Sequence, residues 1–358
     1  MKLTINGEVT DLPAIWWNSD QKKIQLIDQT RLPFKIDIHT CLTYKETADA
    51  IKTMKIRGAP SIGAAAAYGL AQAILEFSGK DTFVSDVEEA YYYLLSSRPT
   101  AVDLKNGLEL IKKEMFRTPD EVMRVAEGFS SSIAEQGRKI GAVGKSLIKN
   151  GMNILTHCHT GALALVDHGS AIAPLIHAWN DGIRFHTYVD ETRPRIQGRL
   201  TSWELGQYGV QHTVICDSAS GHLMSKGKID IIILGADRVA RNGDIANKIG
   251  TYNLAVLAKF HNIPFYSAFP FSTLDMESLT GADIQIEERN HCEISEVAGY
   301  QQTENNEAKV SIYPQNTRFF NPAFDVTTSN LITGYITPKG ILSREELLEV
   351  FENWKISD

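Results

Sequence analysis

Polar and apolar residues alternate over the first 38 positions, the period of strands with one buried face. The alternation breaks at Asn6-Gly7, a dipeptide typical of hairpin turns, and it resumes over residues 23–28. From residue 43 the apolar positions fall at helical spacing, and helical patterns continue to about residue 148. We therefore expect residues 1–148 to form a helical N-terminal domain with a small antiparallel sheet.

Beyond residue 150 the pattern changes to short apolar runs that end in polar residues. The five runs are residues 153–156, 185–189, 213–216, 229–234 and 264–268. The run 229–234 shows no alternation, which indicates a strand buried on both faces. Five such strands separated by helical segments predict a doubly wound parallel sheet over residues 149–358. The fold class that we expect is α/β.

The composition favours a globular protein and disfavours several function classes. Of 358 residues, 43% are hydrophobic and 22% charged, and the net charge of −7 argues against a sequence-independent nucleic-acid binder. The four cysteines form no CxxC pair, so neither a zinc site nor a disulfide framework is indicated. The N-terminal residues lack the apolar core of a signal peptide, and no window resembles a membrane span. We expect a cytoplasmic protein without a membrane or nucleic-acid partner.

An acidic residue follows the buried run 229–234. Asp237 would lie at the carboxyl edge of the sheet, where ligands bind in open parallel sheets, and partial burial would raise the pKa of its carboxyl group. A turn at residues 242–244 then leads to Asn247 and Lys248, which could contact a phosphate. These features make Asp237 a candidate proton donor. An ordinary helix-capping aspartate and a solvated lysine fit the segment equally well.

A cysteine follows the run 153–156. Cys158 precedes small residues that we expect to form a helix from near Gly161, and the positive end of that helix would lower the pKa of the thiol. Neighbouring side chains in a strand point to opposite faces, so at most one of His157 and His159 should share a pocket with Cys158. Cys158 is thus a candidate base or nucleophile, with an inert buried cysteine as the alternative.

Two arginines precede expected helix starts. Arg57 is followed by Gly58, Pro60 and a series of small residues, so free backbone amides beside its guanidinium would form an anion site. Arg98 precedes Pro99 in the same way, with Asp103 able to cap the helix, although a surface arginine in an ion pair fits as well. The pocket suggested by these groups would take a small phosphorylated substrate and transfer a proton. Gly-x-Gly-x-x-Gly and Walker A patterns do not occur in the sequence.

Seven motifs, in order along the chain, resemble the methylthioribose-1-phosphate isomerase family. They are residues 57–63, 97–102, 156–164, 189–198, 235–240, 242–252 and 321–327. The superfamily also contains the regulatory subunits of initiation factor 2B and ribose-1,5-bisphosphate isomerase. The resemblance covers most of the chain.

The resemblance implies an aldose–ketose isomerase of methionine salvage that converts 5-methylthioribose 1-phosphate into 5-methylthioribulose 1-phosphate without a metal or cofactor. It implies that Cys158 and Asp237 are the catalytic pair. The substrate contacts that it implies are Arg57, Gly58, Ala59, Arg98, Gln197, Asn247 and Lys248. It further implies a Rossmann-like C-terminal domain and a homodimer.

Two other functions stay open at this point: an isomerase of 5-deoxyribose 1-phosphate or ribose 1,5-bisphosphate, and a non-catalytic subunit like those of initiation factor 2B. The chain departs from the family at His159-Thr160, where Asn-Ala is usual, and residues 299–320 are longer and more polar than in the family. Candidate walls around sugar C5 are Trp203, Phe271 and Phe319-Phe320, each of which also fits core packing.

Overall fold

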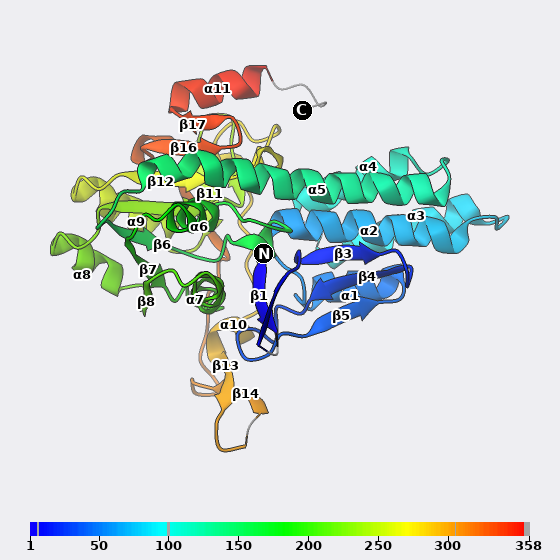
Figure 1. The fold of residues 1–358 in the computed structure, drawn as a ribbon, viewed down its shortest axis with the longest axis horizontal. Helices are drawn as coiled ribbons and strands as arrows, with labels where there is room; N and C mark the ends of the chain where they lie inside the picture. The colour runs from blue at the N-terminus through cyan, green and yellow to red at the C-terminus, as the bar shows by residue number, and fades with distance from the viewer. Residues whose placement is uncertain (6, 99–100, 305, 354–358) are drawn as a thin grey trace.

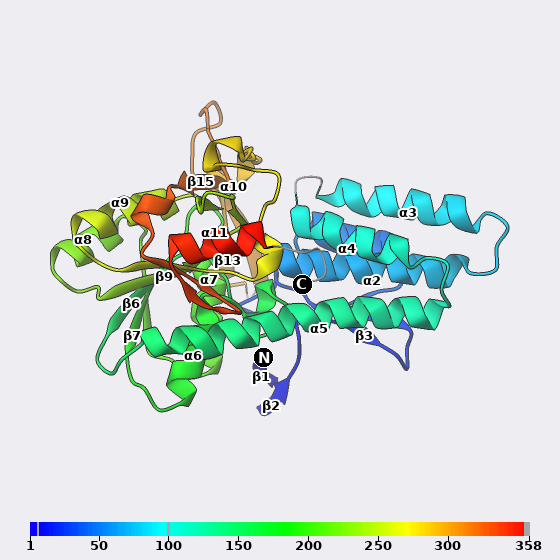
Figure 2. The same cartoon turned by 90° about the horizontal axis from the view of Figure 1, so that it is seen from above.

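The computed structural model describes residues 1–5, 7–98, 101–304 and 306–353. Helices gather at one end of an elongated molecule and a parallel sheet lies at the other (Figures 1 and 2). The α/β class is therefore as predicted. None of the helices in the described ranges combines the length and apolar character that a membrane crossing requires.

The N-terminal residues form two small antiparallel sheets. Strands β1 (Lys2–Ile5) and β2 (Glu8–Asp11) form a hairpin, and β3 (Ile15–Asn18), β4 (Lys23–Ile27) and β5 (Ile38–Cys41) form the second sheet. Alternation along β4 buries Ile24 and Leu26 against the helices. The antiparallel patch predicted from the sequence is thus confirmed, although Asn6 itself lies outside the described residues.

Five helices follow: α1 (Tyr44–Lys52), α2 (Ala59–Phe77), α3 (Phe83–Ser97), α4 (Val102–Lys113) and α5 (Pro119–Gly144). Helix α2 is buried almost throughout and packs closely on α4. A Cβ atom at Gly107 would lie 2.4 Å from the carbonyl oxygen of Gly63, so glycine is needed where these two helices meet. This close approach holds the first turn of α4 beside the start of α2.

The C-terminal sheet has seven strands in the order β17-β16-β12-β9-β6-β7-β8. They are β6 (Asn153–Thr156), β7 (His186–Asp190), β8 (His212–Ile215), β9 (Ile231–Gly235), β12 (Phe265–Ala268), β16 (Gly334–Thr337) and β17 (Gly340–Leu342). All are parallel except β17. The five predicted strands are confirmed, and the sequence pattern missed β16 and β17.

Helices cover both faces of this sheet. One face packs against the end of α5, α6 (Ile172–Asn180) and α7 (Gly198–Gln207), and the other against α8 (Ala219–Ser225), α9 (Thr251–Phe260) and α11 (Arg344–Glu352). This is the doubly wound arrangement that was predicted. Because α5 packs on α2 at one end and on α6 and β16 at the other, a domain boundary at residue 148 stays a prediction.

Several short strands and a short helix lie at the edge of the sheet where the parallel strands end. Strands β10 (Arg238–Val239), β11 (Ile245–Lys248) and β15 (Phe324–Thr327) form a small antiparallel sheet. A short helix α10 (Cys292–Ser295) leads into the hairpin of β13 (Glu296–Gln301) and β14 (Asn306–Ser311), which projects from the body (Figure 1). The segment 299–320 includes most of this hairpin.

Candidate active site

A pocket opens at the point where the order of the strands reverses. Strands β6 and β9 are neighbours, and from them the chain proceeds to opposite edges of the sheet. Such a reversal is where open parallel sheets bind ligands. Cys158 is the second residue after β6, and Asp237 is the second residue after β9.

This cavity, called the reaction pocket here, contains all nine residues predicted as site residues. Its lining includes Cys158, Asp237, Arg57, Gly58, Ala59, Arg98, Gln197, Asn247 and Lys248. They come from the loop before α2, the end of α3, three strand ends of the large sheet and β11. Residues far apart in sequence therefore surround one space.

The backbone of Cys158 is held in an uncommon conformation. Its φ of 66° lies in the left-handed region, which few residues other than glycine adopt. The N–H of Cys158 donates to Oγ1 of Thr192 at 2.9 Å, and its carbonyl accepts from Oγ1 of Thr201 at 2.8 Å. Two neighbouring segments thereby fix the direction of the thiol.

The helix expected after Cys158 does not form. Only the 3-10 turn η2 (Ala162–Ala164) is present, and the carboxylate of Glu204 accepts the N–H groups of Ala162 at 3.0 Å and Leu163 at 2.9 Å. These amides are occupied, so this turn does not supply the helix dipole that was expected to act on the thiol. Burial raises the pKa of Cys158, against the opposing charges of Lys248 and Arg57. The predicted lowering of this pKa was wrong, since burial outweighs the nearby cations.

The carboxyl group of Asp237 behaves as predicted. Burial raises its pKa, while the charges of Lys248, Arg289 and Arg98 act in the opposite direction. The backbone N–H of Asp237 donates to the carbonyl of Ala246 at 2.9 Å, which ties the strand end to β11. The side chain can therefore carry a proton at a higher pH than an exposed aspartate.

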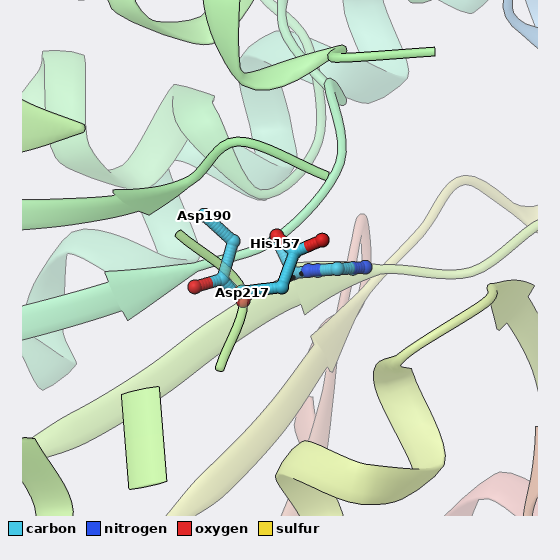
Figure 3. A group of neighbouring side chains, drawn as sticks. All are labelled: His157, Asp190 and Asp217. Atoms are coloured by element: carbon cyan, nitrogen blue, oxygen red, sulfur yellow. Dashed lines mark hydrogen bonds and ion pairs between the residues drawn. The ribbon is translucent and has the colours of Figure 1, made fainter. Parts of the chain in front are cut away.

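A buried ion pair lies behind Cys158. His157 and Asp190, at the ends of β6 and β7, are neighbouring side chains (Figure 3). Nδ1 of His157 lies 2.9 Å from Oδ2 of Asp190, and Nε2 lies 2.9 Å from the carbonyl oxygen of Ile249. An ionised Asp190 and the backbone carbonyl both accept hydrogen bonds, so the imidazolium form of the ring would satisfy both contacts. Burial lowers the pKa of His157, but the neighbouring Asp190 raises it by more, so the net pKa is raised.

Asp217 completes this group from the loop after β8. Its two carboxylate oxygens accept the N–H groups of Thr192 at 2.7 Å and Arg193 at 2.8 Å. His157, Asp190 and Asp217 each place a potential ligand atom within 4.8 Å of the others. Because both ring nitrogens and both Asp217 oxygens already have hydrogen-bond partners, the group is better suited to bracing the loops than to binding a metal ion.

Of the two histidines that flank Cys158, His159 lines the reaction pocket with it. Nε2 of His159 lies 3.1 Å from Oε1 of Glu204, without the alignment of a good hydrogen bond. Burial lowers the pKa of His159. Burial raises the pKa of Glu204, but His159 and the two backbone donors lower it, so the net pKa is lowered. Burial thus favours the neutral form of His159, whereas Asp190 favours the charged form of His157.

The start of α2 presents its backbone to the pocket. Gly58 precedes the helix with φ of 91°, and a Cβ atom there would lie 2.5 Å from Cα of Ala164. The predicted proline lies in the first turn. Beside it, Nη2 of Arg57 is buried without a hydrogen-bond partner in the described part of the chain. Free backbone amides and an unpartnered guanidinium are the groups with which helix starts bind anions.

The other cations of the pocket have weaker or different partners. Arg98 lies 3.7 Å from Glu287. Nζ of Lys248 donates to the carbonyl of Ala323 at 2.6 Å and lies 4.5 Å from the ring centroid of Phe324. Burial lowers the pKa of Lys248 to about 8. An anion entering the pocket would restore the charged form of this lysine.

Several pocket residues were not predicted as site residues. Arg195, Arg289 and Phe324 line the pocket, two of them from irregular segments without periodicity. Asp103 was expected to cap α4, but it lies inside the first turn without a capping hydrogen bond, and burial raises its pKa to about 7. Pro99, the expected helix start, lies outside the described residues.

The aromatic residues considered for the C5 wall lie elsewhere. Trp203 packs beside the N-terminal strands, Phe271 belongs to the core of the sheet and Phe320 is exposed. Phe319 contacts the ring of Tyr313. Core packing, the alternative for these residues, is confirmed for Trp203 and Phe271 and is wrong for the exposed Phe320.

Comparisons with known proteins connect this geometry to a family. The Initiation factor 2 subunit family matches residues 55–344. A methylthioribose-1-phosphate isomerase from Thermosipho melanesiensis is 45% identical over 348 residues, covering 94% of this chain and 97% of the relative. The solved 5-methylthioribose 1-phosphate isomerase of Pyrococcus horikoshii has 36% identity and a TM-score of 0.84, with 96% of each chain covered. The structure of translation initiation factor eIF-2B, subunit delta, from A. fulgidus has 38% identity and a TM-score of 0.82, covering 96% of this chain and 100% of that one.

Proposed function

The chain belongs to the initiation factor 2 subunit family, with the methylthioribose-1-phosphate isomerases among its relatives, and we propose that it converts 5-methylthioribose 1-phosphate into 5-methylthioribulose 1-phosphate. One observation carries the proposal. A candidate acid, Asp237, and a candidate base, Cys158, follow adjacent strands and line the same pocket as an anion-binding helix start. The reaction needs these three elements, and it needs them together.

The phosphate would lie against the start of α2. The backbone N–H groups there and the guanidinium groups of Arg57 and Arg98 supply donors for a dianion, and Lys248 adds a third cation near the reacting carbons. Placing the phosphate in this way positions C1 and C2 of the sugar between Cys158 and Asp237. Gln197 and Asn247 complete the polar lining.

The first step opens the ring. Asp237 donates its proton to the ring oxygen, and the bond between this oxygen and C1 breaks. The thiolate of Cys158 removes the proton from C2, and the electron pair of the C2–H bond becomes the second bond between C1 and C2. Lys248 and Arg57 favour the thiolate, which burial alone disfavours.

The second step forms the ketone. The hydroxyl proton on C2 passes to the Asp237 carboxylate, and the thiol of Cys158 gives its proton to C1, which leaves a carbonyl at C2. Both side chains return to their starting protonation states. The cycle therefore balances without a co-reactant.

Turnover of defined sugars tests the assignment. We expect the purified protein to convert 5-methylthioribose 1-phosphate to the ketose, and detection of the carbonyl product measures this conversion. A preference of about 100-fold for 5-deoxyribose 1-phosphate or ribose 1,5-bisphosphate would assign a different sugar. Absence of turnover with all three sugars would favour a non-catalytic subunit, as the name of the A. fulgidus relative suggests.

The resemblance also leads us to propose a cytoplasmic homodimer. Sedimentation equilibrium of the full chain should give a mass near twice the 39.8 kDa of the monomer. A monomer at micromolar concentration would contradict this part of the proposal.

A further inference from the structure

A second cavity adjoins the reaction pocket. The two share Met54, Arg57, Arg195 and Gln197 as lining residues. The rest of the second cavity, called the side cavity here, comes from residues 29–31, Thr53, the start of α7 and the hairpin β13–β14. The hairpin thus forms its outer wall.

The side cavity is strongly basic although the chain is acidic. Five cationic side chains and one carboxylate line it; the cations are Arg31, Arg57, Arg195, Arg199 and Lys309, and the carboxylate is Glu307. The whole chain carries a net charge of −7, so this cluster is local. Such a cluster attracts anions, and the low-dielectric walls strengthen the attraction.

Only some of these charges are neutralised by the protein. Nε of Arg31 lies 3.5 Å from Glu307 and 3.5 Å from Asp37, and Arg195 lies 2.7 Å from Glu293. No ion pair with a carboxylate occurs for the remaining three cations anywhere in residues 1–5, 7–98, 101–304 and 306–353. These three are Arg57, Arg199 and Lys309.

The guanidinium groups also repel one another. Burial lowers the pKa of Arg199, and the charge of Arg195 lowers it further. Burial likewise lowers the pKa of Arg57 to about 10, and the charges of Arg195 and Arg199 contribute to that lowering. Bringing three such groups together costs free energy that a bound anion would offset.

The hairpin is seated on the N-terminal part by two contacts. The rings of Phe34 and Tyr300 have centroids 5.3 Å apart, and Glu307 pairs with Arg31. These contacts place Lys309 of β14 at the cavity. The outer wall is therefore held in place on both its apolar and its charged side.

We propose that the side cavity binds a phosphate dianion next to the sugar phosphate in the reaction pocket. Guanidinium groups suit phosphate because their planar N–H groups match two of its oxygens at once. The dianion has two possible sources, free phosphate or a phosphoryl group at the far end of a sugar 1-phosphate. Binding of free phosphate is independent of the proposed isomerase function, whereas the sugar source rests on it.

Calorimetric titration of the full chain with inorganic phosphate tests the binding. We expect two sites in the unmodified protein, with Lys248→Met weakening the site in the reaction pocket. Arg199→Gln and Lys309→Gln should each weaken the other site about tenfold, the loss of a charge-assisted contact. Lys139→Gln, an exposed cation outside both cavities, is the matched control and should leave both sites unchanged.

The outcome that overturns the proposal is a single phosphate site that responds to Lys248→Met and not to Arg199→Gln or Lys309→Gln. Lys309 is exposed, so its substitution tests the site even if Arg199→Gln fails to fold. This readout does not depend on turnover, and its failure is therefore distinguishable from failure of the isomerase assignment.

Kinetics with two sugars identify the source. If the phosphoryl group of a sugar occupies the side cavity, Arg199→Gln should lower kcat/KM for ribose 1,5-bisphosphate about tenfold more than for 5-methylthioribose 1-phosphate. If free phosphate is the occupant, phosphate in the side cavity and the methylthio sugar should bind at the same time, so inhibition by phosphate should be mixed, because phosphate also competes with the sugar for the reaction pocket. Strictly competitive inhibition together with an equal effect of Arg199→Gln on both sugars would contradict the proposal.

Discussion

The polar groups behind Cys158 differ from those in front of it. Behind it, on the side away from the reaction pocket, lie His157, Asp190 and Asp217. Both ring nitrogens of the histidine and both oxygens of each carboxyl group have hydrogen-bond partners. In front of it, seven of the twelve buried side-chain atoms that lack a partner in the described chain belong to the reaction pocket. They are on Arg57, Asp103, His159, Thr160, Gln197 and Ser272.

Native proteins rarely leave buried polar atoms unpaired, because each costs free energy. Their concentration in one pocket indicates that a ligand supplies the missing partners. The paired group behind the thiol, in contrast, has no need of a ligand and serves to hold the loops. The comparison separates residues that act on a substrate from residues that position them.

The largest effect should come from the two groups assigned to chemistry. Cys158→Ala and Asp237→Asn should each lower kcat by about 10²- to 10⁴-fold, the usual contribution of a general acid or base. Substrate affinity and the melting temperature should change little, because neither side chain braces the fold. Cys216→Ala removes an exposed thiol and is the control. Turnover that survives either change would remove that residue from the mechanism.

The second-largest effect should be a loss of stability when the buried pair of His157 and Asp190 is broken. Asp190→Asn leaves the buried imidazolium of His157 without its carboxylate, and removal of one partner from a buried pair costs about 3–5 kcal/mol. Asp181→Asn breaks an exposed pair with Lys145 and should cost at most about 1 kcal/mol. Urea unfolding measures both. Equal losses in the two variants would show that the buried pair does not brace the sheet edge.

A smaller effect, on the KM, should come from Arg98, which we place at the phosphate of the substrate. Arg98→Gln removes one charged donor to the phosphate, so KM should rise about 10- to 100-fold with kcat nearly constant. Arg138→Gln, at an exposed pair with Glu135, is the matched control. A fall in kcat without a change in KM would place Arg98 at the reacting carbons instead of at the phosphate.

The smallest effect should be a shift of the pH profile. Asp237 must be protonated and Cys158 ionised, and both pKa values are raised by burial. If the pKa of Asp237 stays below that of Cys158, kcat/KM rises with pH up to the pKa of Asp237 and falls above that of Cys158. The active form, with Asp237 protonated and Cys158 ionised, is then the less populated of the two forms in which these groups hold one proton between them.

Lys248→Met tests that profile. Loss of the cation should raise both pKa values and move the acid limb about one pH unit upward. The alkaline limb should move less, because burial already lowers the pKa of Lys248 to about 8 and the lysine is largely neutral there. An acid limb that stays in place, or moves to lower pH, would exclude Asp237 as its source.

The sequence predicted the parts of the site that lie at ends of regular elements. A fully apolar run such as 229–234 reveals a buried strand, and Asp237 follows from where that strand ends. Strand order is set by long-range packing, so the pattern of apolar residues could not predict that β6 and β9 are neighbours. Strand β16 was missed because it begins at Gly334, and glycine is depleted in strands.

The loop after Cys158 shows why local patterns fail at such a site. Small residues from Gly161 onward favour a helix start, but the carboxylate of Glu204, which is remote in sequence, takes the amides that would begin it. Arg195 and Arg289 lie in irregular segments, where no period marks a pocket residue. Tertiary contacts overrode local preference at both places.

The central claim is that Cys158 moves a proton between C2 and C1 of the sugar. The direct test is to convert substrate carrying deuterium at C2 in ordinary water and to measure the label at C1 of the ketose. Exchange of the thiol proton with solvent predicts loss of at least part of the label. Full retention at C1 in every turnover would indicate direct hydride transfer and would contradict the account.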